Sequence, residues 1–133
     1  MSTLRLSRHD MCERRIKGDS MATDNWTDFT DRTNARMAAL RSAMPEPAKG
    51  FGELARAAIA PGALDSKTKE LIALAIGITA RCDGCLAFHA KAAKKYGATR
   101  EEVVETIAVA LYMGGGPSMI YGAEALSAFD ALA

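Results

Sequence analysis

Residues 65–97 read DSKTKELIALAIGITARCDGCLAFHAKAAKKYG, and this stretch decides the fold. It opens with Asp65 and Ser66, either of which can cap a helix, and then repeats apolar residues at helical spacing as far as Ala80. Because these apolar positions cover nearly the whole circumference, we expect a helix that is the most buried element of the fold. They are Leu71, Ile72, Leu74, Ala75, Ile76 and Ile78.

The second half of this stretch predicts another helix, which begins near Cys82 and ends at Gly97, a residue suited to the left-handed C-terminal position. At about 100° per residue, Cys82, Cys85 and His89 fall on one stripe of that helix, which we expect to face inward. The opposite side should face water with its lysines, which are Lys91, Lys94 and Lys95.

The flanking sequence is helical as well. An amphipathic pattern over residues 24–43 ends at Pro45 and Pro47, and a shorter one covers residues 50–60. Thr99 and Glu102 form a capping box that begins a fifth helix, and a run of three glycines at 114–116 ends it. A sixth helix should run from about residue 117 to residue 132. With only 6% aromatic residues and few valines, the chain is predicted to be an all-α domain of about six helices.

Length and composition limit the function classes. The 133 residues suffice for one domain, and 49% hydrophobic and 25% charged residues are typical of soluble globular proteins. A net charge of +1 provides no electrostatic basis for binding nucleic acid or acidic membranes, and no apolar run is long enough to span a bilayer. Residues 1–20 contain no signal peptide, so we expect a cytoplasmic protein with a disordered or non-native tail (1–20) before the domain (21–133).

The two cysteines and the histidine can support redox chemistry. Cysteines in the first turn of a helix are near its unpaired N–H groups, which favour thiolate over thiol, and a neighbouring imidazole can accept the proton. A thiolate can attack a peroxide oxygen to give a sulfenic acid, which a second thiol one turn away converts to a disulfide. Cys82 and Cys85 have that spacing, and His89 is four residues beyond Cys85.

Other interpretations of the C-x-x-C motif remain open. A thioredoxin-type site is disfavoured because that motif belongs in a βαβ setting, and no strand pattern is present. A structural zinc site needs four ligands, whereas Cys82, Cys85 and His89 supply three. Further ligands would have to come from the tail, at His9 and Cys12.

The spacing of Glu70 and the three site residues resembles the E-x11-C-x2-C-x3-H signature of the AhpD-like alkylhydroperoxidases, which belong to the carboxymuconolactone decarboxylase superfamily. The similarity covers about residues 51–132. From spacing alone, Glu70 would be interpreted as an exposed glutamate in the first turn of its helix. The resemblance instead implies that Glu70 and His89 form a proton relay.

The resemblance also implies roles for the cysteines. Cys85 matches the peroxidatic cysteine, and Cys82 matches the partner that closes the disulfide, with no bound cofactor or metal. The best-known alkylhydroperoxidase has a histidine between its cysteines where this chain has Gly84. True carboxymuconolactone decarboxylases lack the cysteine pair.

These observations predict a thiol-dependent alkyl hydroperoxidase or disulfide reductase. We expect a peroxide substrate and a lipoyl-type or thioredoxin-like dithiol donor. We also expect a homo-oligomer, because the helices carry more apolar surface than one chain can cover. The resemblance implies trimers or hexamers, and a hexamer is preferred because a one-domain chain has no second repeat to cover its own surface. Neither nucleic acid nor a membrane is an expected partner. The alternatives are a lactone enzyme resembling carboxymuconolactone decarboxylase, and a non-catalytic helical module that binds zinc or senses redox state.

Overall fold

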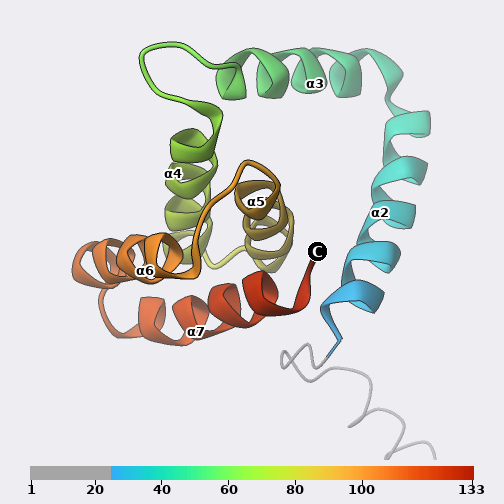
Figure 1. Ribbon diagram of the computed structural model, residues 1–133. Helices are drawn as coiled ribbons and strands as arrows, with labels where there is room; N and C mark the ends of the chain where they lie inside the picture. Colours follow the sequence, from blue (N-terminus) through green and yellow to red (C-terminus); the bar gives the residue numbers. More distant parts are fainter. Residues whose placement is uncertain (1–24) are drawn as a thin grey trace, which may run out of the picture.

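The computed structural model describes residues 25–133, and these form six α-helices with no strand among them (Figure 1). The helices are α2 (Trp26–Ala43), α3 (Pro45–Ile59), α4 (Ser66–Thr79), α5 (Asp83–Lys95), α6 (Arg100–Gly114) and α7 (Gly116–Ala131). The predicted all-α fold is therefore confirmed. The tail predicted for residues 1–20 lies outside the described residues. None of the six helices has the length and hydropathy needed to cross a membrane.

The helices α4 to α7 pack together, while α2 and α3 extend away from them as an arm (Figure 1). The first turn of α2 anchors this arm. Trp26 is only 3% exposed, its indole N–H donates to Ser127 Oγ of α7 at 3.1 Å, and its ring meets Phe29 edge to face. Farther along the arm, α3 has no buried residue at all.

Local caps set most helix ends where the sequence predicts them. The carboxylate of Asp65 accepts the N–H of Thr68 at 2.7 Å and begins α4. Thr99 and Glu102 exchange side-chain-to-backbone hydrogen bonds at the start of α6, which is the predicted capping box. After α5, Gly97 has a φ of 88°, the left-handed conformation expected of a glycine that follows a helix.

Two expected boundaries are wrong. Pro45 does not merely end α2 but begins α3, five residues before the expected start at Gly50. Proline is tolerated in a first turn because its missing N–H has no helical partner there. The last helix begins at Gly116, one residue before the expected Pro117.

The expectation that the helix after Asp65 is the most buried is also wrong for the single chain. One side of α4 is buried through Leu74 and Ile78, but Ile72 and Ile76 are 45% and 61% exposed. Half of the core residues are alanines, whose small side chains allow close helix packing. The members of the core are Trp26, Leu74, Ile78, Leu86, Ala87, Ala90, Ala93, Ala98, Val103, Ala110, Ala125, Ala128, Phe129 and Leu132.

Candidate active site

The turn between α4 and α5 positions the first cysteine. The N–H of Cys82 donates to the carbonyl of Gly77 at 3.0 Å, and the N–H of Arg81 donates to the carbonyl of Ile78 at 3.2 Å. Arg81 has a φ of 57°. This pattern is a Schellman motif, which ends one helix with a left-handed residue and reverses the chain. The residue after the left-handed position is Cys82, which also caps α5.

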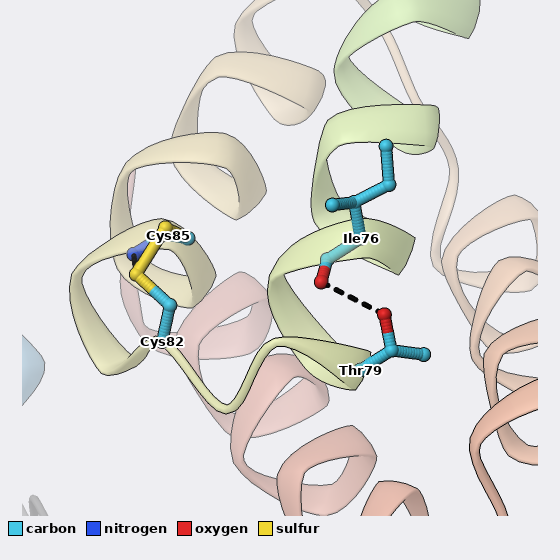
Figure 2. The surroundings of a disulfide bond; sticks show 4 residues. All are labelled: Ile76, Thr79, Cys82 and Cys85. Carbon is cyan, nitrogen blue, oxygen red and sulfur yellow. Dashed lines mark hydrogen bonds between the residues drawn. A yellow bond between two sulfur atoms is a disulfide. The ribbon is translucent and has the colours of Figure 1, made fainter.

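Cys82 caps α5 and Cys85 lies in its first turn, close to the predicted start of this helix, and the two cysteines form a disulfide (Figure 2). Their Cα atoms are 5.2 Å apart, within the range that a disulfide spans. Cys82 Sγ accepts the N–H of Cys85 at 3.2 Å, so this sulfur replaces the side-chain oxygen that usually caps a helix. Both residues are partly exposed, so the pair is accessible rather than fully enclosed in the core.

The structure places Glu70 beside His89. Glu70 Oε2 lies 2.7 Å from His89 Nδ1, and the residue is 5% exposed. The interpretation of Glu70 from spacing alone, as an exposed first-turn residue, is therefore wrong. Burial of a carboxylate requires a partner, and α5 provides it from a position 19 residues further along the chain. The pairing implied by the signature is present.

The Glu70–His89 pair has the geometry of a proton relay. A carboxylate that holds Nδ1–H of an imidazole fixes the tautomer and leaves Nε2 to accept a proton. The His89 side chain is 34% exposed, whereas the Glu70 side chain is 7% exposed. The imidazole is therefore accessible to solvent, whereas the carboxylate that it contacts is almost fully buried.

The lysines of α5 do not all face water. Lys94 is half-buried, and its Nζ donates to the carbonyls of Phe129 and Leu132 at 2.8 and 2.9 Å. The same ammonium lies 5.1 Å from the centre of the Phe129 ring. Lys94 therefore satisfies carbonyls that the end of α7 leaves without helical partners. The expected exposure holds for Lys91 and Lys95.

The sequence patterns did not identify two residues that shape this site, Gly77 and Arg81. The available signal for Gly77 was an isolated glycine inside an apolar helix, which often indicates close packing. Within residues 25–133, no three His, Cys, Asp or Glu side chains are grouped so that they could hold a metal ion. His9 and Cys12, the additional ligands considered for zinc, lie outside this range.

Comparisons with known proteins agree with the all-α fold. The model of the carboxymuconolactone decarboxylase family matches residues 45–128. An uncharacterized protein of Cupriavidus necator is 40% identical over 84% of this chain and 98% of its own length. A solved family member from Legionella pneumophila is 50% identical, with a TM-score of 0.78 over 80% of this chain and 96% of its own.

A second solved protein of the same family comes from Thermotoga maritima. It is 30% identical, with a TM-score of 0.69 over 76% of this chain and 86% of its own. A part in the antioxidative response has been suggested for that protein.

Proposed function

Because this chain belongs to the carboxymuconolactone decarboxylase family, we propose that it acts as a thiol-dependent hydroperoxidase or disulfide reductase of the AhpD-like type. One observation carries the proposal. The Cys82–Cys85 disulfide in the first turn of α5 and the Glu70–His89 pair lie on the same two packed helices. A nucleophile, a resolving thiol and a proton relay are the groups that peroxide reduction by thiols requires.

The oxidative half of the cycle begins with the reduced pair. The Cys85 thiolate attacks one oxygen of the hydroperoxide, so an S–O bond forms as the O–O bond breaks. The alkoxide leaves as an alcohol after it takes a proton from the relay of His89 and Glu70. The Cys82 thiolate then attacks the sulfenic sulfur of Cys85, and hydroxide leaves as water once protonated. The structure has the resulting disulfide.

The reductive half returns both thiols. A small dithiol or dithiol protein, lipoyl-type or thioredoxin-like, attacks one sulfur of the disulfide to form a mixed disulfide. Its second thiol releases the enzyme as the dithiol and leaves the donor oxidised. The net reaction consumes one hydroperoxide and one dithiol and yields an alcohol, water and a disulfide. No bound cofactor takes part.

The second candidate is a lactone decarboxylase-like reaction, which the description of the matched family favours. That reaction makes no use of two thiols. The presence of Cys82 and Cys85 as a bonded pair, with His89 four residues further along α5, therefore favours the redox reaction. The two candidates differ in a measurable way, because replacing the cysteines should leave a lactone activity largely intact.

The decisive experiment uses reduced protein and an alkyl hydroperoxide. Wild-type protein should lose two hydrogens within the peptide that holds both cysteines, and a dithiol should restore them. Cys82→Ser should stop at a sulfenic acid that a 1,3-diketone traps, and Cys85→Ser should not consume peroxide. Peroxide consumption that persists in Cys85→Ser, or lactone turnover that both variants retain, would overturn the proposal.

We also propose that the protein acts in the cytoplasm as a homo-oligomer, with a hexamer preferred. The support for assembly lies in the apolar surface that one chain leaves uncovered. Ile72 and Ile76 of α4, Phe51 of α3 and Tyr112 of α6 are all at least 45% exposed. Uncovered apolar surface of this extent is typical of an interface rather than of a monomer.

A further inference from the structure

Gly77 contacts both cysteines of the candidate site. Its carbonyl accepts the N–H of Cys82 at 3.0 Å, as the first half of the turn between α4 and α5. A methyl group placed on Gly77 would lie 2.8 Å from Cys85 Cβ, closer than side-chain carbons approach one another in proteins. Residue 77 therefore holds Cys82 by a backbone hydrogen bond, and its lack of a side chain leaves room for Cys85.

The backbone of Gly77 does not explain why a glycine stands there. Among the described glycines only Gly97 and Gly115 have a positive φ, so Gly77 has a conformation open to any residue. A glycine inside a helix costs about 0.5–1 kcal/mol relative to alanine. The unfavourable choice is explained by the close approach of α5, whose first turn packs against α4 at this point.

We propose that Gly77 is a positioning residue that sets the equilibrium between the disulfide and the dithiol of Cys82 and Cys85. This inference rests on the proposed function for the claim that the pair cycles between the two states. A side chain at position 77 would displace the turn of Cys85 from α4. Cys82 would stay held by the carbonyl of residue 77.

The direction in which this displacement shifts the disulfide–dithiol equilibrium can be predicted. A disulfide requires a narrow range of Cα separations and side-chain directions, whereas two thiols do not. Moving Cys85 while Cys82 stays in place therefore destabilises the oxidised state more than the reduced one. Gly77→Ala should make the pair a stronger oxidant, with the equilibrium shifted toward the dithiol.

The test is a thiol–disulfide equilibrium in buffers of oxidised and reduced dithiothreitol, with the dithiol fraction measured by alkylation and mass spectrometry. We expect Gly77→Ala to shift the equilibrium constant at least tenfold toward the dithiol, which corresponds to about 30 mV. No peroxide is involved. A protein that consumes no peroxide but shows this shift would refute the peroxidase reaction and leave the role of Gly77 standing.

Gly122→Ala is the matched control. A methyl group on Gly122 of α7 would press on the Ile107 side chain of α6, so it disturbs a helix contact that involves neither cysteine. It should lower stability and leave the thiol–disulfide equilibrium within twofold of the wild-type value. The inference is wrong if Gly77→Ala also stays within twofold, or if both variants shift the equilibrium equally.

A second pair of variants covers the case in which Gly77→Ala does not fold. Cys85→Gly removes the Cβ that the new methyl group would meet. In that background Gly77→Ala should be tolerated and should raise stability, because alanine is the better helix former. If Gly77→Ala unfolds the Cys85→Gly chain as well, the contact with Cys85 is not the reason for the glycine, and the inference is overturned.

Discussion

Arg81 is the only described residue other than glycine with a positive φ, at 57°. For a residue with a Cβ, the left-handed conformation costs about 1–2 kcal/mol. Glycine removes that strain but increases the entropy of the unfolded chain, which offsets part of the gain. We therefore expect Arg81→Gly to raise the free energy of unfolding by about 1 kcal/mol, measured by urea denaturation of the oxidised protein.

Arg81→Ala separates backbone strain from the side chain. Alanine retains the Cβ and so retains the strain, but it lacks the guanidinium. If Arg81→Ala stabilises the protein as much as Arg81→Gly, the strain is not the cause. Because Arg81 lies directly before Cys82, both variants should be compared in the reduced state as well, where an effect on the disulfide no longer contributes.

Glu70 is the residue whose substitution should alter the rate without altering the fold. In Glu70→Gln the amide oxygen can still accept the Nδ1–H of His89, but the buried negative charge is lost. We expect disulfide formation by peroxide to slow by about 10²-fold, the lower end of what a proton-transfer group contributes. Stopped-flow measurement of a single turnover gives this rate.

Glu53→Gln on α3 is the control for this substitution, since Glu53 is exposed and lies on a helix with no buried residue. Its rate should match the wild-type rate. An unchanged rate in Glu70→Gln would show that the Glu70–His89 pair is only a structural contact.

The burial of Glu70 also shows what a sequence pattern can predict at this scale. A position within one helix can be inferred from spacing, because spacing fixes the side of the helix on which a residue lies. A partner on another helix cannot be inferred from spacing. Glu70 and Lys94 were both expected to be exposed, and both bind atoms of another helix, His89 in one case and the carbonyls of Phe129 and Leu132 in the other.

At the scale of the helices, Glu102 links two elements. It completes the capping box of α6 with Thr99, and its carboxylate pairs with Lys67 of α4 at 2.8 Å. The hydrogen bond from Lys67, followed by the backbone of Thr99, lowers the pKa of Glu102 below its usual value. The same hydrogen bond from Glu102 raises the pKa of Lys67.

The lowered pKa fixes the direction of a pH effect. The stabilisation by Glu102 is fully present above the pKa that glutamate has in the unfolded chain, about 4.3, and is lost as pH falls through its lower folded pKa. The raised pKa of Lys67 means that its contribution is lost only at alkaline pH, as pH rises through the folded pKa. We therefore expect Glu102→Gln to destabilise the protein at pH 7 and progressively less as pH falls toward 3.

Urea denaturation across that pH range measures the difference. Glu105→Gln, on the exposed side of the same helix, should leave the pH dependence of stability unchanged. A destabilisation by Glu102→Gln that is constant from pH 7 to pH 3 would mean that the substitution disturbs packing rather than removing a charge interaction.

The helix ends that the sequence predicted correctly are those set by local interactions. Asp65, Thr99 and Gly97 each determine a boundary through hydrogen bonds or backbone conformation within a few residues. The start of α3 at Pro45 was missed because proline is compatible with both the end of one helix and the first turn of the next. The local sequence alone does not distinguish these two positions for a proline.

At the scale of the molecule, the unusual feature is apolar surface. The apolar side of α3 includes Phe51 and Leu54, which are 72% and 64% exposed, and its polar side holds Lys49 and Arg56. Exposed apolar residues also occur on the other helices. They include Ile72 and Ile76 on α4, Val109, Tyr112 and Met113 on α6, and Met119 and Ile120 on α7. An isolated amphipathic helix of this length is not stable without packing of its apolar face.

Assembly into a homo-oligomer would cover this apolar surface. A charged side chain placed on the surface should therefore prevent assembly. Light scattering of the wild-type protein should give about six times the 14.1 kDa of one chain across micromolar dilution. Phe51→Glu places a carboxylate on the apolar side of α3, where burial in an interface would be strongly unfavourable, and should yield a smaller species. Lys49→Glu changes charge on the polar side of the same helix and should retain the wild-type mass. A wild-type mass near that of one chain would refute assembly, whereas a trimer would correct only its stoichiometry.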